Sequence, residues 1–204
     1  MDIAVNLIEN YLRISGYLTL SEFEIQTRKP DGTYQTVTDI DVMAVRFPGA
    51  NYIGDPHGDV EGEALIIDDP ELRLEPDCVD VIIGEVKQGA AELNPGMKDH
   101  SVLHTSLRKI EWLYGEPLSR VISSLQKQDV HSAQARGGGI VRTRLVAFGR
   151  SEVNNIHTIS LAHVISHLLK VFEDHDEAFR PIQFREPAPA FLRLLLKAGF
   201  DVSK

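Results

Sequence analysis

Two strand-like runs of the sequence carry charged side chains where a core strand would be apolar. The run Val-Thr-Asp-Ile-Asp-Val-Met-Ala-Val contains Asp39 and Asp41, and the run Val-Ile-Ile-Gly-Glu-Val-Lys contains Glu85 and Lys87. Successive side chains of a strand point to opposite faces, so the two aspartates share one strand face, as do the glutamate and the lysine. If the two strands are neighbours, a carboxylate from one can lie close to a carboxylate from the other, with Lys87 next to Glu85 on the same strand face.

Converging carboxylates would have a definite chemistry. Two like charges about 4 Å apart repel by roughly 4 kcal/mol at an effective dielectric constant near 20. Such a pair either raises one pKa sharply or binds a cation, and oxygen ligands favour a hard cation such as Mg²⁺ or Mn²⁺. The lysine cannot ligate a metal, so its place is beside developing negative charge or a metal-bound water. Alternatively, Glu85 and Lys87 stand at a solvent-facing strand end and Asp41 caps a turn, where exposed charges contribute about 0–1 kcal/mol.

The surrounding sequence predicts alternating helices and strands. Residues 79–87 form a nearly continuous apolar run, which is typical of a central strand covered on both faces. The expected elements are a helix over 3–15, strands over 17–27, 34–47 and 79–87, helical sequence over 98–134 with a break at 115–117, strands over 140–148 and 156–160, a helix over 161–172, and a short apolar helix within the last 20 residues. This order indicates an α/β domain with a mixed sheet.

The composition is that of an ordinary globular domain. The chain has 204 residues, 43% of them hydrophobic and 25% charged, which predicts one domain rather than a disordered chain. A single cysteine, Cys78, excludes an intramolecular disulfide and fits a reducing compartment. No run approaches 18 consecutive apolar residues, and the N-terminal segment lacks the features of a secretory signal. The sequence therefore predicts a cytoplasmic protein that does not enter membranes.

The charged runs resemble a nuclease signature. Asp41 with the following Val-Met-Ala-Val, and the later Gly-Glu-Val-Lys-Gln that contains Glu85 and Lys87, look like the Asp…(Asp/Glu)-X-Lys signature of the PD-(D/E)XK, or restriction-endonuclease-like, nucleases. The segment from Glu9 to the Gly-Tyr step is similar to the first helix of Holliday-junction-resolvase-like and Mrr-like members, in which a helical glutamate often joins the site. The late strand–helix unit over 157–172 also resembles their core.

This resemblance implies a fold and an activity. The implied fold is an α/β, restriction-endonuclease-like three-layer domain, with a central mixed β-sheet flanked by helices and an αβββαβ core. The domain would cover residues 1–175 with an acidic insertion at about 48–78, and residues 176–204 would form a C-terminal extension packed on it. The implied activity is Mg²⁺- or Mn²⁺-dependent hydrolysis of phosphodiester bonds in nucleic acid, with DNA the expected substrate; a homodimer stays open.

The resemblance also implies roles for individual residues. Asp41 and Glu85 are the implied metal ligands, Lys87 is the catalytic lysine and Glu9 is a further catalytic member. Asp39 is a rival to Asp41, since it lies on the same strand face. The alternative function is a catalytically inactive binding or assembly module built on the same nuclease scaffold.

Charge is unevenly distributed along the chain. Residues 51–100 carry 13 acidic and 3 basic side chains, whereas residues 101–150 carry 3 acidic and 8 basic ones. The basic block could follow nucleic-acid phosphates beside the site, or its members could simply be scattered and solvated. Its members are Arg108, Lys109, Arg120, Lys127, Arg136, Arg142, Arg144 and Arg150.

Two histidine pairs have the i,i+4 spacing that can hold zinc on a helix. They are His100 with His104, and His163 with His167. Neither pair has the glutamate of a His-Glu-x-x-His motif, and the second pair lies off the apolar stripe of its helix. The sequence therefore predicts that His163 and His167 occupy a solvated face, and a zinc protein is the third and least favoured class.

Overall fold

The fold is given by a computed structural model. The structure describes residues 2–49, 51–53, 63–65, 67, 69–151, 156–180 and 182–200. Within these ranges, no helix is both long enough and apolar enough to cross a membrane.

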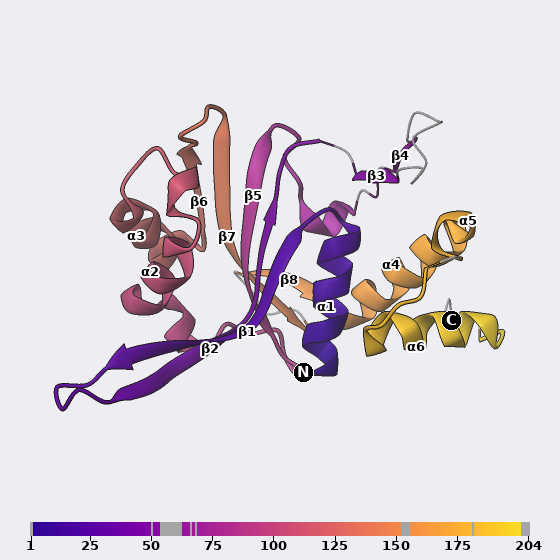
Figure 1. Cartoon of the computed structure of the whole chain (residues 1–204), viewed down its shortest axis with the longest axis horizontal. Helices are drawn as coiled ribbons and strands as arrows, with labels where there is room; N and C mark the ends of the chain where they lie inside the picture. Colours follow the sequence, from indigo (N-terminus) through magenta and orange to yellow (C-terminus); the bar gives the residue numbers. More distant parts are fainter. Residues whose placement is uncertain are drawn as a thin grey trace.

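A six-stranded mixed sheet forms the centre of the domain (Figure 1). The strands are β1 (Leu18–Arg28), β2 (Tyr34–Arg46), β5 (Cys78–Val86), β7 (Ile140–Gly149), β6 (Val130–Gln134) and β8 (His157–Ser160). The first five lie in the order β1-β2-β5-β7-β6, and β8 also pairs with β7. Strand β2 runs antiparallel to both β1 and β5, whereas β5 and β8 each run parallel to β7. The predicted α/β fold with a mixed sheet is confirmed.

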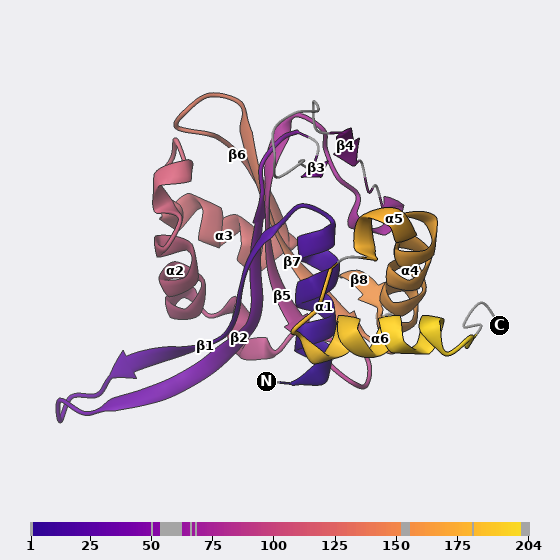
Figure 2. The same ribbon diagram turned by 45° about the vertical axis from the view of Figure 1, so that its right-hand side comes forward.

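Helices cover both faces of the sheet and give three layers (Figure 2). Helices α1 (Ile3–Ile14), α4 (Leu161–Asp174) and α6 (Pro187–Lys197) lie on one face, and α2 (His100–Arg108) and α3 (Leu118–Gln128) lie on the other. Helix α5 (Asp176–Phe179) follows α4, and a separate two-stranded sheet contains β3 (Asn51–Ile53) and β4 (Glu63–Leu65). The far end of the β1–β2 hairpin projects beyond these layers (Figures 1 and 2).

Strand alternation explains how β2 and β5 join the two cores. Val42 and Ile82 belong to the core beneath α1, whereas Met43 and Ile83 belong to the core beneath α2 and α3. Gly84 is required where the strands and β7 approach closely, because a Cβ atom there would lie 2.6 Å from Val42 Cγ1. Both strands are therefore sandwiched, and their charged ends are the exceptions that need an explanation.

The predicted continuation of helical structure to residue 134 is wrong. Helix α3 ends at Gln128, because Asp129 adopts the left-handed conformation with φ 61° and its N–H donates to the carbonyl of Leu125. Residues Val130–Gln134 then form β6, which pairs antiparallel with β7. The three glycines over 137–139 connect these two strands rather than ending a helix.

Part of the predicted insertion belongs to the core. The short 3-10 helix η1 (Pro70–Leu72) begins after Asp69, and both Asp69 and Leu72 are buried. Most of the acidic stretch of the insertion, residues 54–62, lies outside the described residues. The described end of the segment thus connects to the body of the domain through a buried carboxylate and a buried leucine.

Candidate active site

The register of β2 and β5 determines where the predicted carboxylates lie. Val42 is opposite Gly84 in this antiparallel pair, so continuing the register by one residue sets Asp41 opposite Glu85. Asp41 Oδ2 accepts a hydrogen bond of 2.7 Å from the N–H of Val86. The Glu85 side chain is 4% exposed, whereas Asp41 is half-buried. The two carboxylates thus lie where the pairing of β2 with β5 ends.

Burial raises the pKa of both carboxyl groups, and neighbouring negative charges add to the effect. Burial is the largest cause for Asp41, opposed by the hydrogen bond from Val86 and by the positive charge of Lys87. Burial also raises the pKa of Glu85, and the negative charge of Asp41 adds to this effect. A cation placed beside both groups would relieve the repulsion and stabilise their charged forms.

Lys87 lies beside this pair. Its ammonium group forms an ion pair with Glu85, and 45% of its side chain is exposed. The hydrogen bond to Glu85 raises the pKa of Lys87, and the negative charges of Glu85 and Asp41 act in the same direction. The lysine is therefore a cation at neutral pH that reaches from a buried carboxylate toward solvent.

Two further acidic residues act on the same end of the sheet. Asp39 is exposed, and its negative charge raises the pKa of both Asp41 and Glu85. Asp2, the N-cap of α1, adds to the effect on Asp41 and accepts a hydrogen bond of 3.3 Å from Gln88 Nε2. Asp2 was not among the residues predicted from the sequence. It could have been found as an aspartate directly before an amphipathic helix, which is the usual capping position.

Glu9 makes a separate set of interactions on α1. Its buried carboxylate accepts a hydrogen bond of 3.0 Å from Thr19 Oγ1 and forms an ion pair with Arg13. Thr19 lies opposite Ala44, three residues along β2 from Asp41, which corresponds to about 10 Å of strand. The structure thus gives Glu9 partners on α1 and β1, at a different level of the sheet from Asp41.

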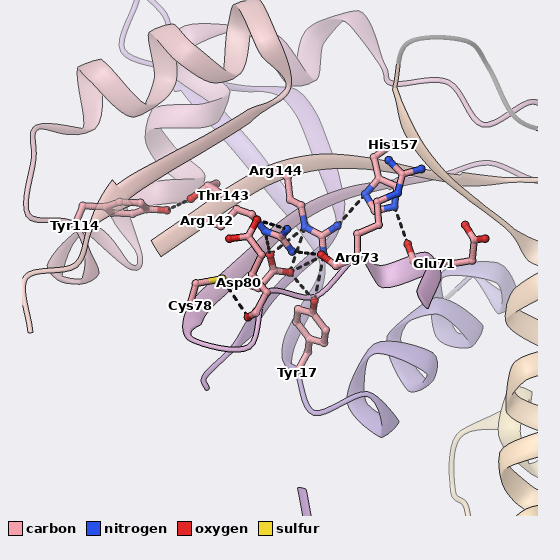
Figure 3. A network of polar contacts seen from close by, with 11 residues as sticks. Tyr17, Glu71, Arg73, Cys78, Asp80, Tyr114, Arg142, Thr143, Arg144 and His157 are labelled. Atoms are coloured by element: carbon pink, nitrogen blue, oxygen red, sulfur yellow. Dashed lines mark hydrogen bonds and ion pairs between the residues drawn. The ribbon is translucent and has the colours of Figure 1, made fainter. Parts of the chain in front are cut away.

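Neither alternative for the basic block holds for Arg142 and Arg144, because both side chains are buried. Their guanidinium groups converge on Asp80 (Figure 3). Asp80, which is 1% exposed, accepts hydrogen bonds from Arg142 Nε at 2.8 Å and from Arg144 Nη2 at 2.7 Å. Tyr17 donates its hydroxyl to the same carboxylate at 2.5 Å. Alternation on β7 places the two arginines on one face, and that face meets a buried aspartate of β5 rather than solvent.

The other members of the basic block remain exposed. Arg108 forms an ion pair with Glu111, and Arg120 forms one with Glu116, so these two charges are partly offset. Lys109 lies over the ring of Phe23 at 5.0 Å from its centroid. The remaining exposed members are Lys127, Arg136 and Arg150.

The predicted solvated position of His167 is also wrong. Its side chain is 13% exposed and packs edge-on against the ring of Tyr11, with 5.6 Å between centroids. His163, which is 34% exposed, forms a 2.8 Å contact through Nε2 with Oδ2 of Asp69. Burial lowers the pKa of His167, opposed by the charge of Asp69. Periodicity on α4 places these histidines off the apolar stripe, but Asp69 contacts both of them and Tyr11 packs against His167.

Comparisons of the chain with protein-family models, with curated proteins and with solved structures found no match. The chemistry of the site is therefore inferred from its own residues. Asp41 and Glu85 offer oxygen ligands only, which suit Mg²⁺ or Mn²⁺. Among the described residues, the group of three close side chains that could hold a metal ion is a different one, formed by Asp69, His163 and His167.

Proposed function

We propose that the chain is a divalent-metal-dependent nuclease of the PD-(D/E)XK type, which hydrolyses phosphodiester bonds in nucleic acid. The observation that carries this proposal is the position of Asp41 and Glu85 one residue beyond the pair Val42–Gly84 of β2 and β5, with Lys87 in an ion pair with Glu85. The exposed lysine and half-buried Asp41 give solvent access to a charge cluster that is otherwise costly to bury.

The order of elements supports the restriction-endonuclease-like core. Helix α1 is followed by the antiparallel strands β1, β2 and β5, then by α2 and α3, and then by β7, which runs parallel to β5. This is the αβββαβ order that the resemblance implies, with the second helix present as two short helices. The proposed ligands lie on the second and third strands, which is where the signature expects them.

The two carboxylates fit a hard divalent cation. Burial raises the pKa of both groups, and the charge of Asp41 adds to the effect on Glu85, so a cation beside the pair would stabilise their charged forms. Mg²⁺ is commonly held by one or two carboxylates together with water and substrate phosphate, so two protein ligands are enough. When bound, such an ion supplies a water of lowered pKa and neutralises phosphate charge.

Lys87 acts as a cation in this proposal, because Glu85 raises its pKa and keeps its ammonium protonated. The ammonium donates hydrogen bonds to the phosphate oxygens as negative charge develops there. In the hydrolysis, a water oxygen bonds to phosphorus and the bond from phosphorus to O3′ breaks. One water proton ends on the leaving O3′, which gives a 3′-hydroxyl and a 5′-phosphate.

Nuclease assays on the full chain test this function. Supercoiled plasmid, single-stranded DNA and RNA are incubated with millimolar Mn²⁺ or Mg²⁺. We expect cleavage by the wild type and loss of cleavage in Lys87→Ala and Asp41→Asn. Lys197→Ala is the matched control, because Lys197 is an exposed lysine on α6, on the other face of the sheet, and should leave cleavage unchanged.

A metal-binding measurement distinguishes a catalytically inactive nuclease fold that still binds metal from a chain whose Asp41 and Glu85 bind no metal. Mn²⁺ should raise the melting temperature of the wild type, corresponding to about 2.7 kcal/mol at a hundred times its dissociation constant. Asp41→Asn should lose most of this gain without losing metal-free stability, since its side-chain oxygen can still accept from Val86. Mn²⁺ binding without cleavage would favour the binding module, and equal behaviour of wild type and Asp41→Asn would refute the site.

A further inference from the structure

We propose that Asp69, His163 and His167 form a Zn²⁺ site, distinct from the carboxylate pair on β2 and β5. Each residue offers one ligand atom, and these atoms all lie within 4.8 Å of one another. The site joins helix α4 to the residue that precedes η1. This proposal does not depend on nuclease activity.

Helix α4 holds the two imidazole rings side by side. Residues four apart lie on one helix face, and the rings of His163 and His167 stack with 6.0 Å between centroids and 25° between planes. Oδ2 of Asp69 lies 2.8 Å from His163 Nε2 and 3.6 Å from His167 Nδ1. Ligand atoms around a tetrahedral Zn²⁺ with bonds of 2.0–2.2 Å are about 3.4 Å apart, which falls between these two distances. Bound Zn²⁺ would have to draw the three ligand atoms, which lie within 4.8 Å of one another, to this spacing.

His167 has no structural explanation as an ordinary buried histidine. Its Nδ1 is 3.6 Å from Asp69 Oδ2, which is too long for a hydrogen bond, and its buried Nε2 has no partner within the described part of the chain. Buried polar atoms are almost always hydrogen-bonded, because an unpaired one costs free energy. Zn²⁺ bound at Nδ1 accounts for a nitrogen that faces the carboxylate of Asp69 without a hydrogen bond. The unpaired Nε2 is a separate feature that an ion at Nδ1 would not satisfy.

Asp69 is held in place by groups behind it. The hydroxyl of Tyr11 donates to Oδ2 at 2.5 Å, and the N–H of Glu71 donates to Oδ1 at 3.0 Å. Outer partners of this kind orient metal-ligating side chains and tune their affinity. The carboxylate is 1% exposed, so its charge is available only to its immediate neighbours.

The ligand set and its surroundings indicate Zn²⁺ with an open coordination position. Two imidazoles and one carboxylate suit Zn²⁺ better than Mg²⁺, which prefers oxygen ligands. The three residues line a cavity of about 420 Å³ together with Lys170 and Asp174. Three protein ligands facing an accessible cavity match zinc sites that bind a water or an anion in the fourth position, and Lys170 lines the same cavity.

Metal titration of the tag-free, metal-stripped chain tests the site. We expect one-site binding of Zn²⁺ by calorimetry, and Co²⁺ as a spectroscopic probe should give the visible absorption of a four-coordinate ion. His163→Gln and His167→Gln should each lower Zn²⁺ affinity by at least about tenfold. The matched control is the double variant His100→Gln/His104→Gln, since those rings are also stacked at 6.0 Å on α2 but belong to no close group with a carboxylate among the described residues.

Several outcomes would overturn the site. They are a folded wild type that binds no Zn²⁺, binding that survives both His163→Gln and His167→Gln, and binding that is lost in the α2 control. Circular dichroism of each variant verifies that it is folded. Asp41→Asn should keep Zn²⁺ binding, so failure of the nuclease proposal and failure of this one are distinguishable.

Discussion

Replacing Asp80 by asparagine should severely destabilise the fold. Its carboxylate is the shared acceptor of two buried guanidinium groups, from Arg142 and Arg144, and of the hydroxyl of Tyr17. Oδ1 accepts from Arg142 Nε and Arg144 Nε, and Oδ2 accepts from Arg144 Nη2 and Tyr17. Asparagine has almost the same shape but replaces one of these oxygens with a donor. Either orientation therefore points an NH₂ group at a guanidinium, and both buried arginines lose their common counter-charge.

The magnitude follows from the burial of this cluster. Asp80, Arg142 and Arg144 are 1%, 7% and 4% exposed. Breaking a buried ion pair from one side costs about 3–5 kcal/mol, because the remaining charge stays desolvated. Glu75 offsets part of this cost, since it accepts from Arg142 Nη1 at 2.9 Å. We therefore expect Asp80→Asn to lower the free energy of unfolding by about 3 kcal/mol, a large share of the 5–15 kcal/mol that is typical of a domain.

Urea denaturation at neutral pH, followed by circular dichroism, measures this loss. The control is Asp77→Asn, the same substitution three residues earlier at an exposed position, which should stay within about 0.5 kcal/mol of the wild type. The cluster lowers the pKa of Asp80, so its contribution is present above the unfolded-state pKa and disappears as the pH falls through the native one. An Asp80→Asn protein as stable as the Asp77→Asn control would refute the reasoning.

Two other variants probe the same sheet. Burial and the charge of Arg144 lower the pKa of His157 from 6.5 to about 4, so between these values the unfolded chain binds a proton that the native chain does not. The free energy of unfolding should therefore fall by about 2 kcal/mol as the pH drops through this window, which is less than the full linkage value because the ring is partly exposed. Urea titrations at pH 7 and 4.5 should show a smaller fall for His157→Gln than for the wild type. Gly84→Ala should cost about 1–2 kcal/mol, since its Cβ would lie 2.6 Å from Val42 Cγ1 and 3.0 Å from Phe148 Cε2. In thermal melts, the double variant Gly84→Ala/Val42→Ala should lose less stability than the sum of the losses of the two single variants. Strictly additive losses would contradict the clash.

Local patterns predicted the elements and the residues that share a strand face. The period-two alternation of β2 and β5 places Asp41 on the face of Met43, and Glu85 on the face of Ile83, and the structure buries both apolar residues in the same core. The bounds of most strands could be predicted because glycine, proline and charge end them locally. From the sequence alone, the pairing of β2 with β5 was an assumption. The structure shows that the two strands pair antiparallel, with Val42 opposite Gly84.

The helix boundary near Asp129 needed tertiary information. The segment after it has no strong period of its own, and its strand state results from pairing with β7. Backbone hydrogen bonds to β7, the next strand along the chain, outweigh the weak helix preference of this segment.

Burial of charge was decided by the tertiary structure alone. Arg142 and Arg144 alternate on β7 as an exposed basic face would, and His167 lies off the apolar stripe of α4 as a solvated residue would. A period shows which residues share a face but not what that face meets. Asp80 on a neighbouring strand, and Asp69 from a segment nearly a hundred residues away, neutralise or contact these groups and make their burial possible. Compensation between charges distant in sequence exists only once the chain is folded, which is why the sequence by itself determined the charged faces and the fold determined their partners.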